Sequence, residues 1–239
     1  MKAAALVVIR PEPGNAVTLA AARALGFEVY GEPLFRIVAT PWEPPPTAQF
    51  DAVLIGSANA LRHGGRALAS YVALPAYVVG KTTAKAARDT GFVVAATGSG
   101  GLQELTAQLV QDGHKRVLRL AGAEHVALDA APGTGITTVV VYDAIALPLS
   151  PTCAARLAHG AVVLLHSAAA ARHFATECDR SAIAKRAIAL ACLGPRIAIA
   201  AGDGWGSVAS VPRPDDTALL ALAAQMCQTA RFGDTDDKN

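Results

Sequence analysis

Two serines head the same seven-residue pattern, Ser-Ala-x-Ala-x-Arg-His, once at Ser57–His63 and again at Ser167–His173. Each copy follows a short apolar run, Ala52–Ile55 or Ala161–Leu165. This order predicts a buried strand that delivers a serine to the start of a helix. The first turn of a helix has unpaired N–H groups and the positive end of the helix dipole, so it attracts anions. Two such turns predict one ligand with several negative groups, held from two sides.

The two serines also have a structural interpretation. A serine hydroxyl at a helix start accepts a hydrogen bond from an unpaired N–H group of the first turn, which makes serine a favoured N-cap. The sequence does not separate capping from ligand contact, so both roles stay open. The matched His63 and His173 lack metal-ligand spacing and indicate a shared structural role.

The repeat extends beyond these serines. Val78–Ala84 matches Cys192–Ala198, since each ends an apolar run and begins a predicted helix, and Leu6–Arg10 matches Val117–Ala121. These matches indicate two units of roughly 110 residues, a period far longer than that of solenoid repeats. Segments rich in Ala and Val often look alike, but chance does not readily place Ser, Arg and His at matched offsets.

Most predicted strands are continuous apolar runs, which is typical of strands buried on both faces of a parallel sheet. They are Ala4–Ile9, Glu28–Tyr30 with Leu34–Val38, Ala52–Ile55, Ala76–Val79, Val93–Ala96, Val117–Leu120, Thr137–Leu147, Ala161–Leu165, Ala187–Leu193 and Val208–Val211. Helices such as Ala16–Leu25 and Lys81–Asp89 alternate with them, so we expect an α/β fold. Ligands of such folds bind beyond the carboxyl ends of the strands, where Arg10 and both serines are expected.

Composition and motifs exclude several classes of protein. The chain has 239 residues, of which 52% are hydrophobic and 17% charged, so it is globular. A net charge of +2 and a small number of aromatic residues argue against a protein that binds nucleic acid. The four cysteines have no CxxC spacing and are predicted to be reduced. No run approaches the ~20 apolar residues of a membrane helix, and Met1–Arg10 has no cleavage site, so we expect a cytoplasmic protein.

The motifs of common cofactor sites are incomplete. Gly80-Lys81-Thr82 resembles the end of a phosphate-binding loop, but Pro75 stands where that loop has its first glycine. The glycines at 98–101 and 202–206 do not form G-x-G-x-x-G after a first strand, and no G-x-S-x-G elbow is present. We therefore predict that the protein needs no metal and no organic cofactor.

Motifs along nearly the whole chain resemble the uroporphyrinogen-III synthase family. They are Val8–Gly14, Ile55–Ala60, Tyr77–Gly80 with Thr83-Ala84, and Val141-Tyr142. The resemblance implies two similar parallel-sheet, flavodoxin-like domains joined by a two-stranded β linker. Pro33–Ile37 and Ala144–Pro148, extended and bounded by proline, would be the two crossings. We expect domain 1 at residues 1–36 and 148–232, domain 2 at residues 39–143, and a disordered tail at 233–239.

The resemblance also implies a reaction. The family cyclises hydroxymethylbilane, a linear tetrapyrrole with eight carboxylates, to uroporphyrinogen III in haem biosynthesis, with loss of water, inversion of ring D and no cofactor. The expected protein is a monomeric lyase that binds this small molecule and neither nucleic acid nor membrane. A transient contact with hydroxymethylbilane synthase is a further expectation.

Carried onto this chain, the family tyrosine falls on Tyr142, which would donate a proton or hydrogen bond to the leaving hydroxyl; its alternative role is that of a half-buried strand tyrosine. The implied substrate-binding residues are Arg10, Ser57, Asn59, Gly80, Thr82, Thr83, Ser99, Gly122, Ser167, Gly194 and Arg196. The turn at 194–197 departs from the pattern of some family members, because Arg196-Ile197 stands where they have two threonines. Arg196 then either clamps a carboxylate or faces solvent.

Two other classes of protein remain as alternatives. A non-catalytic two-domain binding module for a small polyanion would use the same anion-binding turns. A duplicated receiver domain would need acidic residues after its first strand, where Arg10 stands. An assay coupled to hydroxymethylbilane synthase, which separates isomer III from the spontaneously formed isomer I, distinguishes an enzyme from a binding module.

Overall fold

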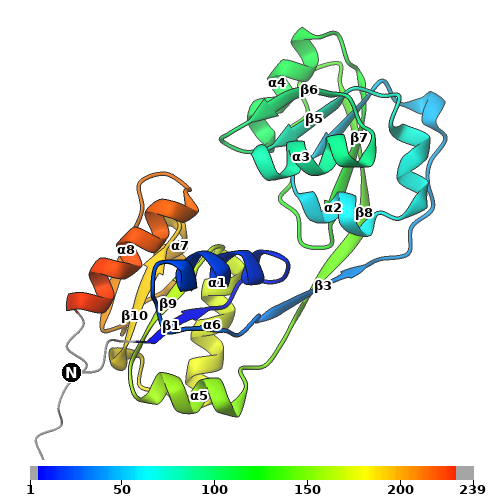
Figure 1. Ribbon diagram of the computed structural model, residues 1–239. Helices are drawn as coiled ribbons and strands as arrows, with labels where there is room; N and C mark the ends of the chain where they lie inside the picture. Colours follow the sequence, from blue (N-terminus) through cyan, green and yellow to red (C-terminus); the bar gives the residue numbers. More distant parts are fainter. Residues whose placement is uncertain (1–4, 230–239) are drawn as a thin grey trace, which may run out of the picture. The chain divides into compact units, whose positions relative to one another are not determined.

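The computed structural model describes residues 5–229, which form two compact α/β units (Figure 1). Unit 1 contains the described residues up to Arg36 and from Ala146 onward, and unit 2 is Ile37–Ile145. The predicted strand residue Ala4, the end of domain 1 beyond residue 229 and the predicted disorder of residues 233–239 lie outside the described part. The chain therefore begins in unit 1, builds unit 2 and returns.

Unit 1 is built on a five-stranded parallel sheet with the order β11–β10–β9–β1–β2. Its strands are β1 (Ala5–Val8), β2 (Val29–Gly31), β9 (Ala161–Leu165), β10 (Ile188–Cys192) and β11 (Ser207–Ser210). One face packs against α1 (Gly14–Ala24) and α8 (Asp216–Thr229). The other packs against α5 (Pro151–Ala158), α6 (Ala168–Arg180) and α7 (Pro195–Ala201), with a 3-10 turn at Lys185–Ala187.

Unit 2 is built on a six-stranded sheet with the order β3–β8–β7–β4–β5–β6. Its strands are β3 (Phe35–Ala39), β4 (Ala52–Ile55), β5 (Ala76–Val79), β6 (Val94–Gly98), β7 (Arg116–Gly122) and β8 (Gly135–Ala146), and β4 to β8 pair in parallel. Helices α2 (Ala58–His63) and α3 (Lys81–Thr90) cover one face and α4 (Leu102–Gln111) the other. Two 3-10 turns are Thr47–Gln49 and Arg66–Tyr71.

Strand β3 lies at the edge of this sheet, hydrogen-bonded to β8. The boundaries between the units fall within β3 and at the end of β8. The two-stranded linker expected from the family therefore stays a prediction, whereas the parallel α/β sheets are confirmed.

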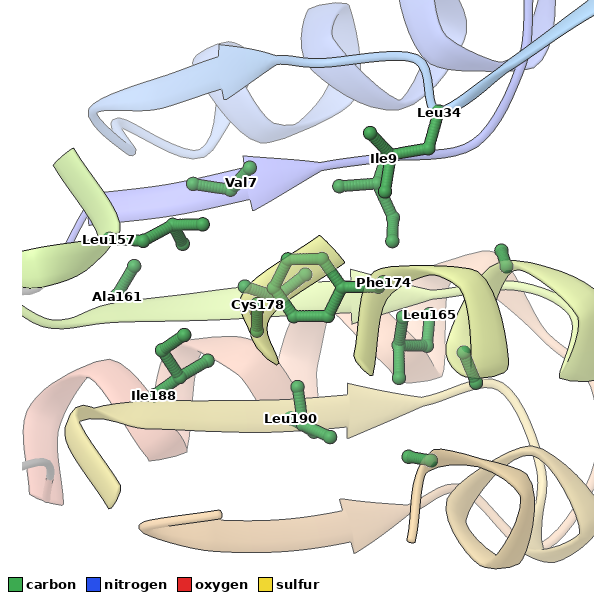
Figure 2. Packing of buried hydrophobic residues seen from close by; sticks show 14 of the residues in the cluster. Val7, Ile9, Leu34, Leu157, Ala161, Leu165, Phe174, Cys178, Ile188 and Leu190 are labelled. Atoms are coloured by element: carbon green, nitrogen blue, oxygen red, sulfur yellow. The ribbon is translucent and has the colours of Figure 1, made fainter. Parts of the chain in front are cut away.

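The central strands are buried on both faces, as continuous apolar runs predict. All residues of β4, β9 and β10 are buried, and Figure 2 shows Val7, Phe174 and Leu190 as members of one cluster of buried side chains in unit 1. Each fully buried Val, Leu or Phe contributes about 1.5–3 kcal/mol relative to an exposed one. Predicted element ends coincide with the observed ends, as in β4, β5 and β9, or differ from them by one or two residues. The four cysteines are free, as predicted.

The two sheets share one strand order. The order β2–β1–β9–β10–β11 of unit 1 corresponds to β8–β7–β4–β5–β6 of unit 2, so the serine-bearing strands β9 and β4 hold the same central position. The order along the chain is permuted, because β1 and β2 come first in unit 1 and β7 and β8 come last in unit 2. Between β7 and β8, residues 123–134 form no helix where unit 1 has α1. The sequence match of Leu6–Arg10 with Val117–Ala121 agrees with this correspondence.

Side chains of unit 1 anchor the chain where it returns from unit 2. Glu177 Oε2 accepts a 2.6 Å hydrogen bond from the Leu149 N–H group, and His173 Nε2 lies 2.7 Å from the Leu147 carbonyl oxygen. Arg180 donates two hydrogen bonds to the buried Glu177 carboxylate, from Nη2 to Oε2 at 2.6 Å and from Nε to Oε1 at 3.0 Å. The hydrogen bonds from Arg180, together with the one from Leu149, hold the pKa of Glu177 at about 2 although its burial opposes this.

Replacing this carboxylate should weaken unit 1. We expect Glu177→Gln to lower the free energy of unfolding at pH 7 by about 1–3 kcal/mol, because Arg180 and the Leu149 N–H group lose a charged acceptor. Since the pKa of Glu177 is lower in the folded state, its contribution is complete above its ordinary pKa of 4.5 and is lost as the pH falls toward 2. Urea unfolding at pH 7 and pH 3 should show the deficit shrinking at pH 3. Glu43→Gln, in the exposed proline-rich segment, is the control and should match the wild type at both pH values.

Candidate active site

The two central strands of each sheet lead to opposite faces at their carboxyl ends. In unit 1, β1 leads to α1 on one face and β9 leads to α6 on the other. In unit 2, β4 leads to α2 on one face, and β7 leads to residues 123–134, of which Leu128 packs on the other. The place where two neighbouring strands lead to helices or loops on opposite faces of a sheet is its switch point. Doubly wound sheets bind their ligands there. The expected sites of both units are therefore the ends of these two strand pairs.

Both repeated serines cap the helices that begin at these switch points. Ser57 Oγ accepts a hydrogen bond from the Asn59 N–H group at 3.2 Å, and Ser167 Oγ accepts one from Ala170 at 3.1 Å. The capping interpretation is thus confirmed. Each cap uses the oxygen only as an acceptor, and within residues 5–229 neither hydroxyl donates a hydrogen bond. Because a hydroxyl can accept and donate at once, capping is compatible with ligand contact.

The neighbouring turn of unit 2 also presents backbone N–H groups. Gly80 has φ 79°, a left-handed conformation that favours glycine, and α3 begins after it without a side-chain cap. Thr83 is buried in the first turn, whereas Thr82 is exposed. The first turn of α3 therefore retains N–H groups for an anion.

Other predicted binding residues differ in their surroundings. The exposed Ser99 precedes Gly100, whose N–H group donates to Glu104 at 3.0 Å, so a carboxylate of the chain itself already occupies this turn. In unit 1, Gly194 precedes α7, and Arg196 is exposed in the first turn. The exposed position of Arg196 agrees with either role proposed for it. Asn59 Oδ1 accepts a 3.2 Å hydrogen bond from Arg62 on α2.

Tyr142 lies on β8 opposite Gly122, the last residue of β7. A Cβ atom added to Gly122 would come 2.6 Å from Cζ and 2.9 Å from the hydroxyl oxygen of Tyr142, so the ring occupies the place of a side chain at position 122. The ring is half-buried, and its hydroxyl makes no hydrogen bond to any described residue. Tyr142 therefore has a fixed ring and an available O–H group beside the end of β7.

Sequence reasoning missed Arg119, which is buried in the middle of β7. Its Nη1 donates to the Val126 carbonyl at 2.8 Å, and its Nε has no hydrogen-bond partner within residues 5–229. Burial lowers the pKa of Arg119, and the interaction with Tyr142 opposes this shift. The signal in the sequence was an arginine inside an apolar run. The cation supports residues 123–134, which replace the helix found in unit 1.

Arg10 is paired, which the sequence did not predict. Its Nη1 donates to Asp216 Oδ2 at 3.1 Å and to Thr18 at 3.3 Å, and its guanidinium lies against Gly14. Asp216 Oδ1 lies 3.5 Å from Nε2 of His166, the residue before Ser167. Sequence reasoning missed His166 and Asp216, although His166 stands where the first copy of the repeat has Gly56. Arg10 therefore belongs to a polar cluster at the switch point of unit 1.

Neither metal-ligand clusters nor membrane spans occur in the part of the chain that the structure describes. No three His, Cys, Asp or Glu side chains come together there as metal ligands would. None of the helices formed by residues 5–229 combines the length and hydropathy needed to cross a membrane.

The chain is similar to known proteins in sequence pattern and in fold. The family model of uroporphyrinogen-III synthase HemD matches residues 16–221. The uroporphyrinogen-III synthetase of Helicobacter pylori superimposes with a TM-score of 0.62 at 18% identity, covering 93% of this chain and 99% of that one. A mutant uroporphyrinogen III synthase of Thermus thermophilus gives a TM-score of 0.56 at 14% identity, covering 95% and 100%. No curated protein matches the sequence.

The contact between Gly122 and Tyr142 predicts that one methyl group added at position 122 lowers the stability of unit 2. We expect Gly122→Ala to displace the Tyr142 ring and to destabilise unit 2 by about 1–3 kcal/mol, because the new Cβ overlaps the ring. Gly135→Ala is the matched control, since its Cβ would meet only the Lys115 oxygen at 3.9 Å. Thermal unfolding and the ring resonances of Tyr142 measure both effects. Equal behaviour of the two variants would contradict the packing described.

Proposed function

The chain belongs to the uroporphyrinogen-III synthase family, and we propose that Tyr142 and the serine turns of both units carry its reaction. The chain is a lyase of haem biosynthesis that cyclises hydroxymethylbilane to uroporphyrinogen III with loss of water and inversion of ring D. The alternative of a non-catalytic binding module is not favoured.

The substrate carries many carboxylates, and both units offer groups that bind such anions. Ser57 and the first turn of α3 supply a hydroxyl and backbone N–H groups in unit 2, and Ser167 supplies a hydroxyl in unit 1. Helix starts and hydroxyls bind carboxylates without a large positive charge, which suits a chain with a net charge of +2. We propose that carboxylates of one substrate contact both units.

Tyr142 is proposed as the group that assists departure of the hydroxyl. The electron-rich pyrrole supplies an electron pair to its hydroxymethyl carbon, the bond between that carbon and the hydroxyl oxygen breaks, the Tyr142 O–H group gives a proton to the leaving oxygen, and water is released. Ring closure onto the same carbon later releases one proton to solvent. The tyrosine then regains a proton from solvent. Its free hydroxyl and fixed ring support this role.

Three further expectations belong to this proposal. They are a cytoplasmic location, a monomeric state and a transient contact with hydroxymethylbilane synthase. The contact is expected because hydroxymethylbilane closes spontaneously to isomer I when it is not captured.

Removing the tyrosine hydroxyl tests the catalytic role. We expect Tyr142→Phe to slow isomer III formation by roughly 10- to 1000-fold, because one positioned proton donor is lost. Some activity should persist, since the substrate ionises by itself. The coupled assay with separation of isomers I and III measures the rate, and Tyr30→Phe in unit 1 is the control with the same chemical change. Wild-type rates in a folded Tyr142→Phe protein would reduce Tyr142 to a strand residue.

Substituting the two serines tests whether both units bind substrate. We expect Ser57→Ala and Ser167→Ala each to raise KM roughly tenfold with a smaller effect on kcat, since a hydrogen bond to a charged group contributes about 1.5–3 kcal/mol. The two effects should roughly add in the double mutant, because the serines share no partner.

The loss of a helix cap must be separated from the loss of a substrate contact. Ser150 caps α5 by accepting from Cys153 at 3.1 Å and is not a proposed ligand, so Ser150→Ala reports the cost of the cap alone. It should lower stability as the other two do and leave KM unchanged. If only one unit ever affects KM, substrate binding by both units is wrong.

A further inference from the structure

The position between the central strand and the capping serine is apolar in unit 2 and polar in unit 1. Gly56 and His166 each follow the central strand and precede the capping serine, and Leu102 and Asp216 each begin the next helix on the opposite face of the sheet. In unit 2 the position is apolar, because a Cβ on Gly56 would lie 2.8 Å from the Leu102 side chain. In unit 1 it contains an imidazole that faces a carboxylate. Burying polar groups costs free energy unless they are hydrogen-bonded, so the unit 1 arrangement calls for a functional explanation.

Asp216 lies between Arg10 and His166, but only Arg10 is within normal hydrogen-bond distance of it. Its Oδ2 accepts from Arg10 at 3.1 Å, whereas its Oδ1 stays 3.5 Å from His166 Nε2, beyond the about 2.7–3.2 Å of a normal N–H···O hydrogen bond. The His166 side chain is only 6% exposed, and neither ring nitrogen has a well-formed hydrogen bond to a described residue. Asp216 cannot move closer freely, because it belongs to the first turn of α8, which the Asp215 side chain caps through the Ala218 N–H group.

The electrostatic surroundings keep His166 uncharged. Burial and the nearby Arg10 lower its pKa to about 4, although Asp216 and the Leu164 backbone oppose this. A neutral imidazole at pH 7 has one N–H group to donate. Arg10 also has donors available for a ligand, because its Nε and Nη2 donate no hydrogen bond within residues 5–229. The cluster thus combines donors of Arg10 that make no hydrogen bond to a described residue with a carboxylate that already accepts from Nη1.

We propose that Arg10 and His166 form a carboxylate-binding subsite of unit 1 in which Asp216 is an internal occupant that a substrate carboxylate displaces. This rests on the proposed function only in that the substrate is a polycarboxylate. A carboxylate that is not tethered to α8 can approach Arg10 and His166 together at normal hydrogen-bond distances. The Asp216 side chain is 51% exposed, so its release into water costs little.

The internal carboxylate also makes the subsite selective. A small monocarboxylate from solution must compete with Asp216, whose effective concentration at the subsite is high. A substrate whose other carboxylates are already bound elsewhere on the protein also has a high effective concentration at the subsite, and it displaces Asp216. Asp216 therefore excludes small anions from Arg10 and admits only ligands with several negative groups.

Removing the charge of Asp216 tests the displacement. We expect Asp216→Asn to lower KM for hydroxymethylbilane and the inhibition constant of acetate by roughly 2- to 5-fold each, the range of a half-exposed ion pair. Asp203→Asn, which removes the same charge from the exposed 202–204 turn, should change neither constant. His166→Asn with Asp216 in place should raise KM. A higher or unchanged KM in Asp216→Asn would overturn the proposal, because Asp216 would then serve to hold Arg10.

A binding measurement separates this proposal from the proposed function. The ring resonances of His166 are followed by NMR while sodium acetate is added to each protein. They should move saturably in Asp216→Asn, stay nearly constant in the wild type at the same concentrations, and stay constant in the Arg10→Met, Asp216→Asn double mutant. A response of the double mutant equal to that of Asp216→Asn would contradict the subsite. Failure of the wild type to form isomer III would overturn the proposed function alone, since this titration needs no turnover.

Discussion

Strands that are buried on both faces leave a sheet no place for polar chemistry except its ends. In both units the central strands consist of fully buried apolar residues, and helices or loops cover each face. Polar groups therefore gather where the strands stop and the helices begin, and there unpaired N–H groups and the helix dipole favour anions. Arg119 is the exception within a strand, and its burial is tolerated because the Val126 carbonyl of residues 123–134 accepts one of its hydrogen bonds.

The same strand order places different side chains at the strand ends of the two units. Unit 2 lacks a helix after β7, and the Tyr142 ring uses the space that Gly122 leaves at that strand end. Unit 1 has α1 there, and Gly14 at its start makes room for the Arg10 guanidinium. The first arrangement presents a proton donor and the second a cation beside an imidazole.

Carboxylates of the chain itself occupy two of the positions expected to bind substrate anions. Glu104 accepts from the Gly100 N–H group next to Ser99, and Asp216 accepts from Arg10. Both acidic side chains lie in the first turn of a helix, where the dipole stabilises a negative charge. Such occupants satisfy donors that could otherwise bind anions, and in the displacement that we propose a ligand exchanges one carboxylate for another. Such an exchange would favour a substrate that binds through many carboxylates at once.

The sequence by itself determined the features that depend on neighbours in the chain. Apolar runs marked the buried strands, serines marked the helix starts, and the order of motifs marked the family, because periodicity and capping are local. The permuted strand order, the pairing of Arg10 with Asp216 and the contact of Gly122 with Tyr142 emerged only in the tertiary structure. Their partners are distant in sequence or lie across strands, and no local pattern specifies which side chain fills the space beside another. Arg10 therefore looked like a free cation until the fold brought Asp216 and His166 to it.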